Sequence, residues 1–284
     1  IKVQVMHHFF SMMKKNPLGR LMHDLSRFTF IGHALHGDGP FRPKISYDSD
    51  QRAIDSGTTY LIRYPRENNE KFARRNEVAF YESPLQRATS RFISHLSKKP
   101  VSREIGPALM LAMSQDIDLK GNNINVFWQD FMVEAKARGS MLLLVDMPAW
   151  FGSTAQEQLQ DRRAPYWTPI KPESVTNFEL NETGKFEFVE FSGTYYGDAD
   201  PVPCYWRFSA VDWQCIDQND KNLLAGDEHD LGETPVLIFT ESGGFPCYGA
   251  FTPIADLAKR LFNLDSELDE ILRAQTFSLL TMPV

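Results

Sequence analysis

The sequence is poor in cysteine and in positive charge, and each shortage excludes a class of protein. Only three cysteines occur among 284 residues, Cys204, Cys215 and Cys247, and no two of them form a CxxC pair. A disulfide framework and a zinc ribbon are therefore excluded, and the count fits a reducing compartment. The formal net charge is −7, whereas proteins that grip nucleic acid through its phosphates usually carry a basic excess. We expect no tight binding of nucleic acid, although an acidic protein can still surround DNA.

Long hydrophobic runs are also missing. The longest, Met141 to Val145, is far too short to span a bilayer. The first residues, IKVQVMHHFF, have neither the long apolar core nor the small-residue cleavage site of a signal peptide. We therefore expect a soluble protein that is made in the cytoplasm and has no contact with a membrane.

The common catalytic and cofactor motifs are absent. The sequence has no GxxxxGK[ST] phosphate loop, no GxGxxG turn, no GxSxG elbow and no HExxH. A nucleotide-driven motor is therefore unsupported, and we predict a protein that is not an enzyme, with no catalytic residue, no cofactor and no bound metal.

Two short segments invite a different interpretation. Asp116 to Gly121 resembles the start of a calcium loop, but Lys120 and Phe127 occupy the fifth and twelfth positions, where oxygen ligands belong. His229 and Ser242 could belong to a hydrolase site. That site needs a nucleophile oriented by a base, and neighbouring glycines are its only support. Turn residues explain both segments better, so a soluble hydrolase remains the weakest alternative.

Helices and strands are expected to alternate without a regular βαβ rhythm, which predicts an α+β fold. Turn formers indicate a loop from residue 37 to 57, and a polar, proline-containing excursion covers residues 151–175. Apolar periodicity predicts helices over residues 70–81 and 124–138, and another that begins at Pro84 and includes Lys98. It predicts strands over residues 141–145, 186–191, 204–213 and 235–239.

The helix after Ser83 has a clear start, because Ser83 can cap it and Pro84 suits its first position. Its predicted inward face holds Leu85, Ala88, Phe92 and Leu96. A second face holds Arg87, Arg91 and Lys98, which we interpret as a solvated face. In a ring this candidate basic contact face could also touch a neighbouring subunit or DNA.

The C-terminal helix is the clearest element. We expect Thr252 to cap it, Pro253 to start it, and the helix to run to about Gln275. Alternating spacings of three and four make a heptad seam of Ile254, Leu257, Leu261, Leu264, Leu268 and Ile271. Three heptads fit a seam between helices and a core-facing helix equally well. On a helical wheel we place Asp256, Glu267 and Glu270 roughly opposite the seam, with Asp265 and Asp269 flanking it.

Three groups of segments together resemble the portal proteins of tailed bacteriophages, in particular the portal-like group of that family. They span roughly residues 58 to 284, and no single motif among them is specific. The His229–Phe239 segment followed by the long helix carries most of the resemblance. The groups are residues 60–63, 70–75 and 80–100; residues 116–118, 131 and 139–148; and residues 229–239, 253–275 and 276–284.

The resemblance implies a structural protein. It implies a homo-oligomeric ring, usually a dodecamer, at one capsid vertex of the virion, where double-stranded DNA passes without sequence specificity during packaging and ejection. The implied partners are the major capsid protein, the terminase large subunit and a head–tail adaptor. Another capsid or head–tail interaction protein is the runner-up.

The same resemblance implies a division of the chain. Residues 1–250 would form the portal wing domain, 251–275 the first stem helix, and 276–284 would lead into the clip. We expect the rest of the clip, the second stem helix, the tunnel loop and the crown to lie outside these residues. Leu257, Leu261, Leu264, Leu268 and Ile271 would pack between subunits, and Asp256, Glu267 and Glu270 would face the channel.

Overall fold

The computed structural model of the chain describes residues 17–99, 101–147, 164–196 and 200–276, together with residues 154 and 157. The structure is 38 % helix and 25 % strand, and this mixture confirms the predicted α+β class. Every strand pair among the described residues is antiparallel. In the described part of the chain, no helix is both long and apolar enough to cross a membrane.

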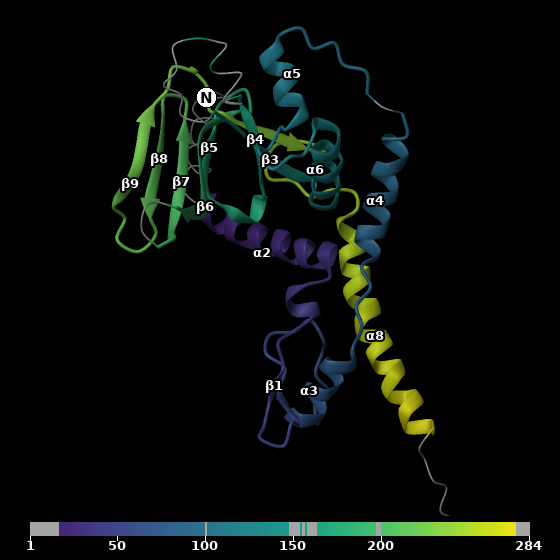
Figure 1. The fold of residues 1–284 in the computed structure, drawn as a ribbon. Helices are drawn as coiled ribbons and strands as arrows, with labels where there is room; N and C mark the ends of the chain where they lie inside the picture. The colour runs from purple at the N-terminus through teal and green to yellow at the C-terminus, as the bar shows by residue number, and fades with distance from the viewer. Residues whose placement is uncertain are drawn as a thin grey trace, which may run out of the picture. The chain divides into compact units, whose positions relative to one another are not determined.

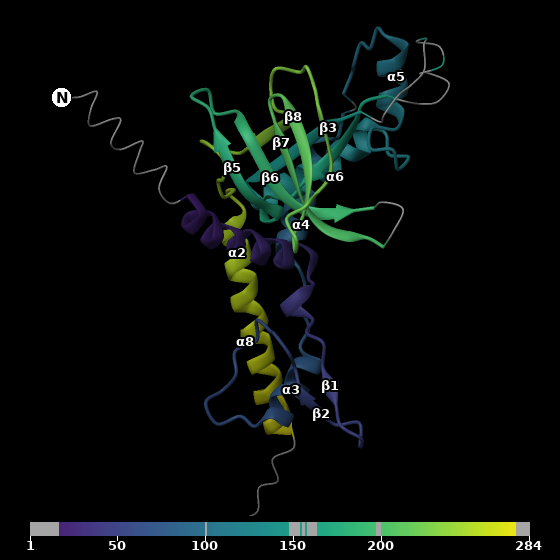
Figure 2. The same ribbon diagram turned by 90° about the vertical axis from the view of Figure 1, so that its left-hand side faces the viewer.

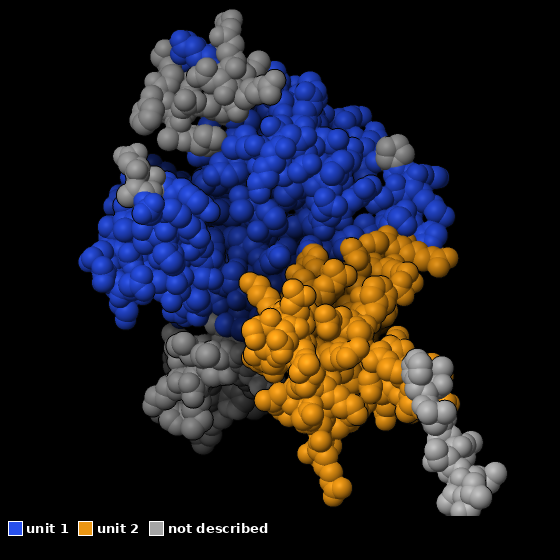
Figure 3. Space-filling model, turned by 60° about the horizontal axis from the view of Figure 1, so that its bottom comes forward, with its two compact units in different colours: residues 1–29, 92–250 blue, residues 30–91, 251–284 orange. Residues whose placement is uncertain are grey.

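The chain folds into two compact units, coloured separately in Figure 3. Unit 1 contains residues 1–29 and 92–250, and unit 2 contains residues 30–91 and 251–284. This division differs from the expected boundary at residue 250, because residues 30–91 belong to the same unit as the C-terminal helix. Whether either unit is a wing or a stem stays a prediction.

In its described residues, unit 1 contains two sheets and two α-helices of its own, and it shares two more α-helices with unit 2. The shared helices are α2 (Pro17–His36) and α4 (Pro84–Leu96). The elements of unit 1 are α5 (Ala108–Gln115), α6 (Ile124–Arg138), β3 (Ser140–Asp146), β4 (Tyr166–Ile170), η2 (Pro172–Ser174), β5 (Val175–Leu180), β6 (Phe186–Tyr195), β7 (Val202–Ser209), β8 (Asp212–Asp217), β9 (Leu223–Glu228) and β10 (Val236–Thr240).

Strand β3 is the centre of unit 1. It lies between β10 and β4 in a three-stranded sheet, and β5 to β9 form a five-stranded meander (Figure 2). Met141 and Leu143 pack in a core that includes Phe127 and Phe131 of α6, beside β3 in Figure 1. Leu142 belongs to the second core, shared with the five-stranded sheet. Burial on both faces explains why β3 is a continuous apolar run and does not alternate.

Helix α6 begins and ends where the sequence predicts. The Asn123 side chain accepts hydrogen bonds from the first turn, and Gly139 ends the helix with a φ of 86°. A Cβ at Gly139 would lie 1.9 Å from the backbone nitrogen of Gly249, so the close approach of these two segments also requires glycine there.

Unit 2 is smaller and includes the chain's last helix. Its elements are η1 (Gly39–Phe41), β1 (Ser46–Tyr47), β2 (Ala53–Asp55), α3 (Asn69–Val78) and α8 (Thr252–Thr276). The small β1–β2 hairpin lies within residues 37–57, which were expected to be a loop. Helix α3 confirms the helix predicted over residues 70–81, although it ends three residues earlier.

Several sequence predictions in unit 1 are wrong in detail. The strand expected over residues 204–213 is two strands, β7 and β8, joined by a turn in which Ser209 Oγ accepts a hydrogen bond from the Val211 backbone N–H. Serine and aspartate shape this turn without glycine or proline, so the usual signal is missing. Strand β4 lies inside the expected excursion over 151–175. Four elements gave no recognised signal: α5, β5, β8 and β9.

The predicted inward face of α4 is right for Leu85 and wrong for Phe92 and Leu96. The structure buries Leu85, Thr89 and Ile93, whereas Phe92 and Leu96 are 40 % and 62 % exposed. The predicted cap is confirmed, because Ser83 Oγ accepts a hydrogen bond from the Gln86 backbone N–H at 3.0 Å.

Candidate subunit interface on helix α8

One face of helix α8 packs on the rest of unit 2. Four residues of the helix are almost fully buried, and their spacing of three or four places them on one side: Ala255, Ala258, Phe262 and Ser266. The Phe262 ring contacts Phe41 and Tyr81 edge to face, with centroid distances of 5.4 Å and 5.8 Å. Burial raises the pKa of Tyr81 to about 12, although a hydrogen bond with Ser83 lowers it.

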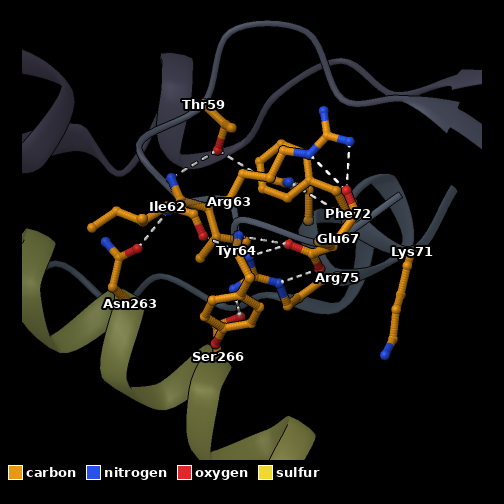
Figure 4. Close-up of polar contacts among 12 residues, drawn as sticks. Thr59, Ile62, Arg63, Tyr64, Glu67, Lys71, Phe72, Arg75, Asn263 and Ser266 are labelled. Carbon is orange, nitrogen blue, oxygen red and sulfur yellow. Dashed lines mark hydrogen bonds and ion pairs between the residues drawn. The ribbon is translucent and has the colours of Figure 1, made fainter. Parts of the chain in front are cut away.

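Asn263 fixes the position of α8 along this face by bonding to an extended segment of the chain. Its side-chain oxygen accepts a hydrogen bond from the Ile62 backbone N–H at 2.7 Å (Figure 4). Its amide nitrogen donates to the Tyr60 carbonyl at 3.1 Å. Asn263 therefore pairs with two backbone groups that are about 200 positions away in the sequence.

A buried ion pair supports the same contact. Arg75 of α3 forms an ion pair with Glu67 at 2.9 Å, and both side chains are less than 5 % exposed. The Arg75 guanidinium also donates to the Ile62 carbonyl at 2.5 Å and to Ser266 Oγ on α8 at 3.4 Å (Figure 4). It lies 4.1 Å from the centre of the Tyr64 ring. Every part of the guanidinium is thus engaged, as a buried charge requires.

The predicted heptad seam faces the other way. Leu257, Leu261, Leu264, Leu268 and Ile271 are between 47 % and 63 % exposed, and the adjacent Leu272 is 50 % exposed. Of the seam, only Ile254 is half-buried. The core-facing alternative is therefore wrong for these five residues, because the core takes the opposite, small-residue face. These five residues form an exposed apolar stripe along α8, called the α8 stripe below. The other face of the helix packs within unit 2.

The acidic residues of α8 differ in their position relative to this stripe. At about 100° per residue, Asp256 and Glu267 lie about 100° and 80° from the centre of the stripe, so their predicted position opposite the seam is wrong. Glu270 lies about 140° away, roughly opposite the stripe as predicted. Glu267 and Glu270 lie near Tyr64: burial raises the pKa of Tyr64, Arg75 lowers it, and these two carboxylates raise it further. Glu270 also pairs with Arg273 at 3.5 Å. Whether the three acidic residues face a channel stays a prediction.

A second acidic flank is formed by Asp265 and Asp269, both exposed. On the helical wheel Asp265 lies about 80° from the centre of the stripe, on the side away from Glu267, which fits the predicted flanking position. Asp269 lies on the same side but about 120° from the centre, so it is further from the stripe than predicted. The stripe is therefore bordered by carboxylates on both sides in the second half of the helix.

The candidate basic contact face does not form a single face of one helix. Arg87 forms an ion pair with Glu82, and the two side chains are 72 % and 54 % exposed, so this pair adds little stability. Lys98 lies beyond the end of α4 and lines a groove in unit 1. A contact role for Arg87, Arg91 and Lys98 stays a prediction.

The two segments that suggested calcium or hydrolase chemistry are both described by the structure. Asp118 accepts hydrogen bonds from the backbone N–H groups of Lys120 and Asn122, and these bonds lower its pKa against the effect of burial. No hydrogen bond joins His229 to Ser242, both of which the structure describes, and the ring nitrogens of His229 are buried without a partner. Among the described residues, no group of three His, Cys, Asp or Glu side chains is placed to hold a metal ion.

Sequence reasoning missed the residues that anchor α8, although part of the signal was present. Ala255, Ala258, Phe262 and Ser266 repeat at helical spacing directly opposite the leucines, which marks a second packing face. Thr252 Oγ1 is buried without a hydrogen-bond partner among the described residues, so the predicted side-chain cap does not form.

No protein-family model matches the chain, and no curated protein matches it closely enough to be counted as a relative.

Proposed function

We propose that this chain is a portal protein of a tailed bacteriophage and assembles into a ring-shaped channel for DNA at one capsid vertex. The proposal begins from the resemblance of residues 58–284 to that family. The observation that carries it is the exposed leucine stripe of α8, whose opposite face is already packed and hydrogen-bonded within the chain.

The stripe is suited to contact between copies of the chain. Burying one leucine side chain contributes about 1.5–3 kcal/mol. Five large apolar side chains follow one another along 15 residues of helix, with about 21 Å of helix axis between the first and the last. An anchored helix loses little conformational entropy when it binds, so most of that gain is available for association. When each copy carries two different surfaces that fit one another, every copy is rotated by the same angle from the one before it. The copies then close into a ring if that rotation closes.

The charge of the chain suits a conduit better than a DNA-gripping protein. With a net charge of −7, the chain lacks the basic excess through which proteins usually grip phosphates. In this proposal Asp256, Glu267 and Glu270 line part of the channel, where like charge keeps the moving DNA from adhering within a screening distance of about 8 Å at physiological salt. The protein holds no nucleotide site of its own and works with a terminase large subunit, the major capsid protein and a head–tail adaptor.

Electron microscopy of the negatively stained product of the complete gene tests the proposal directly. We expect closed rings with a central hole and, by light scattering, a mass many times that of one chain. A single-chain mass across all salt and protein concentrations, with no rings in the images, would contradict it.

A further inference from the structure

Unit 1 has a groove that combines apolar walls with a basic rim. It is formed by the end of α4, the segment that follows it, and one side of α6, and its volume is about 380 Å³. Leu96, Trp128 and Met132 are among its apolar lining residues. Trp128 is held in place by stacking on Phe131 at 5.2 Å and by an edge-to-face contact with Phe239 at 5.5 Å. The apolar wall is therefore rigid, as a docking surface requires.

The rim of the groove carries three cations, Lys98, Lys99 and Arg103. In the described part of the chain neither lysine forms an ion pair, and Arg103 donates to the neutral side chain of Asn125 at 2.5 Å. This is a local basic excess on a chain of net charge −7. The wall beside it continues into exposed apolar side chains, since Leu96 and Val101 are 62 % and 61 % exposed.

The second half of the α8 stripe has the complementary pattern. Leu264 and Leu268 are half-exposed; Asp265 lies about 60° round the helix from Leu268, and the exposed Asp269 follows one turn later on the same side. The first half is less suitable, because the exposed cation of Arg260 lies about 60° from the centre of the stripe there. A groove of this size lies in the lower part of the range of about 300–1,000 Å³ for ligand sites, so it accommodates a few side chains and not the whole stripe.

We propose that the groove of unit 1 receives Leu264 and Leu268 of α8 from a neighbouring copy, with Asp265 and Asp269 facing Lys98 and Lys99. This inference rests on the proposed ring and names the second surface that a heterologous contact needs. It also separates the two acidic flanks of α8: Asp265 and Asp269 face the neighbouring subunit, whereas Glu267 and Glu270 remain free for the channel.

Charge reversal on the two surfaces tests the contact. The groove variant is Lys98→Glu with Lys99→Glu, and the helix variant is Asp265→Lys with Asp269→Lys. We expect each to need at least about tenfold more protein for half-maximal assembly, measured by sedimentation velocity, because like charges then oppose each other across the contact. Low salt should sharpen the effect, since added salt screens exposed charges.

Mixing the two variants gives the decisive result. In a 1:1 mixture the two variants can alternate around the ring, and every groove then meets a helix of opposite charge. Assembly should therefore return, although neither variant assembles well alone. The variant with all four substitutions should also assemble. Misfolding cannot produce either recovery, and circular dichroism of each variant confirms its fold.

Two matched controls reverse the same number of charges elsewhere. Glu267→Lys with Glu270→Lys changes the other flank of α8, and Lys120→Glu with Lys171→Glu changes two exposed lysines of unit 1 outside the groove. Both should assemble like the unchanged protein. If the unchanged protein assembles and the groove variant does so equally well, or if the mixture shows no recovery, the docking inference is wrong and the proposed ring stands. If the unchanged protein stays a single chain, the proposed function and the inference both fail.

Discussion

Phe262 and Leu264 are two positions apart on α8 and face opposite directions. The Phe262 ring is 3 % exposed and packs against Phe41 and Tyr81, whereas Leu264 is 50 % exposed. Each residue turns an α-helix by about 100°, so two side chains that are two positions apart point about 200° apart, to opposite sides of the helix. The helix is thus apolar on two faces, and only one of them is used inside the chain.

The exposed face should therefore serve assembly and contribute little to folding. We expect Leu264→Asp to abolish oligomers, because its charge would become buried without a partner in the packed contact. The free energy of unfolding should fall by less than about 1 kcal/mol, since the residue is half-exposed in the single chain. Light scattering and urea unfolding measure the two effects. Normal assembly of Leu264→Asp would show that the stripe is not an interface.

The buried face should give the reverse result. Phe262→Ala removes an aromatic ring from a closed cluster and should lower the free energy of unfolding by about 3–5 kcal/mol. Leu268→Ala is the matched control on the same helix, because Leu268 is 52 % exposed, and it should cost less than about 1 kcal/mol. Equal losses in the two variants would contradict the observed orientation of α8.

The Arg75–Glu67 pair should be strongly coupled. Arg75→Met leaves the Glu67 carboxylate buried without its cation, and we expect a loss of about 3–5 kcal/mol in the free energy of unfolding. Adding Glu67→Gln removes the unpaired charge and should recover a large part of that loss. A double-mutant cycle by chemical denaturation measures the coupling. Additive effects would show that the two side chains do not interact in solution.

The free energy of unfolding should fall at acid pH, because the Glu241 carboxylate becomes protonated. Burial raises the pKa of Glu241, but bonds from Lys136 and from the Ala250 backbone N–H, together with the Lys136 charge, hold it below its ordinary value. The carboxylate therefore stabilises the fold above the unfolded-state pKa, near 4.5, and this contribution is lost as the pH falls through the lower folded-state value.

The free energy of unfolding, measured with denaturant between about pH 7 and pH 3, follows this effect. In Glu241→Gln the fall of this free energy at acid pH should be smaller than in the unchanged protein. Glu233→Gln is the control, because its partner Lys185 and Glu233 itself are 65 % and 64 % exposed and such pairs contribute little. An unchanged acid limb in Glu241→Gln would contradict the role of this carboxylate.

The acidic flank proposed to face the channel predicts an effect on DNA movement. Glu267→Lys with Glu270→Lys should leave the ring intact but slow packaging or ejection, because a basic wall attracts phosphates. A packaging assay at low and moderate salt measures this, and the slowing should weaken as salt screens the charges. Normal packaging at both salt concentrations would exclude an electrostatic role for this flank.

Local patterns in the sequence predicted several elements because the determining interactions are short-range. Asn123 and Gly139 bound helix α6, and each acts on the turn beside it. The apolar run at 141–145 predicted a buried strand, and β3 confirms it. Strands β5 and β8 were missed because their residues are mostly half-exposed, and β9 because four of its six residues are exposed. Neither alternation nor a long apolar run therefore marks them.

The spacing of the leucines on the last helix was determined by the sequence alone, and so was the existence of an apolar stripe. Which face of that helix packs inside the chain was decided only by the tertiary structure. The hydrophobic effect is non-directional, so a stripe of four leucines and one isoleucine suits a core and an interface equally. The choice was made by Phe262 and Asn263, whose aromatic and hydrogen-bond partners lie about 180 to 220 positions earlier in the chain. No local pattern reports a partner at that distance.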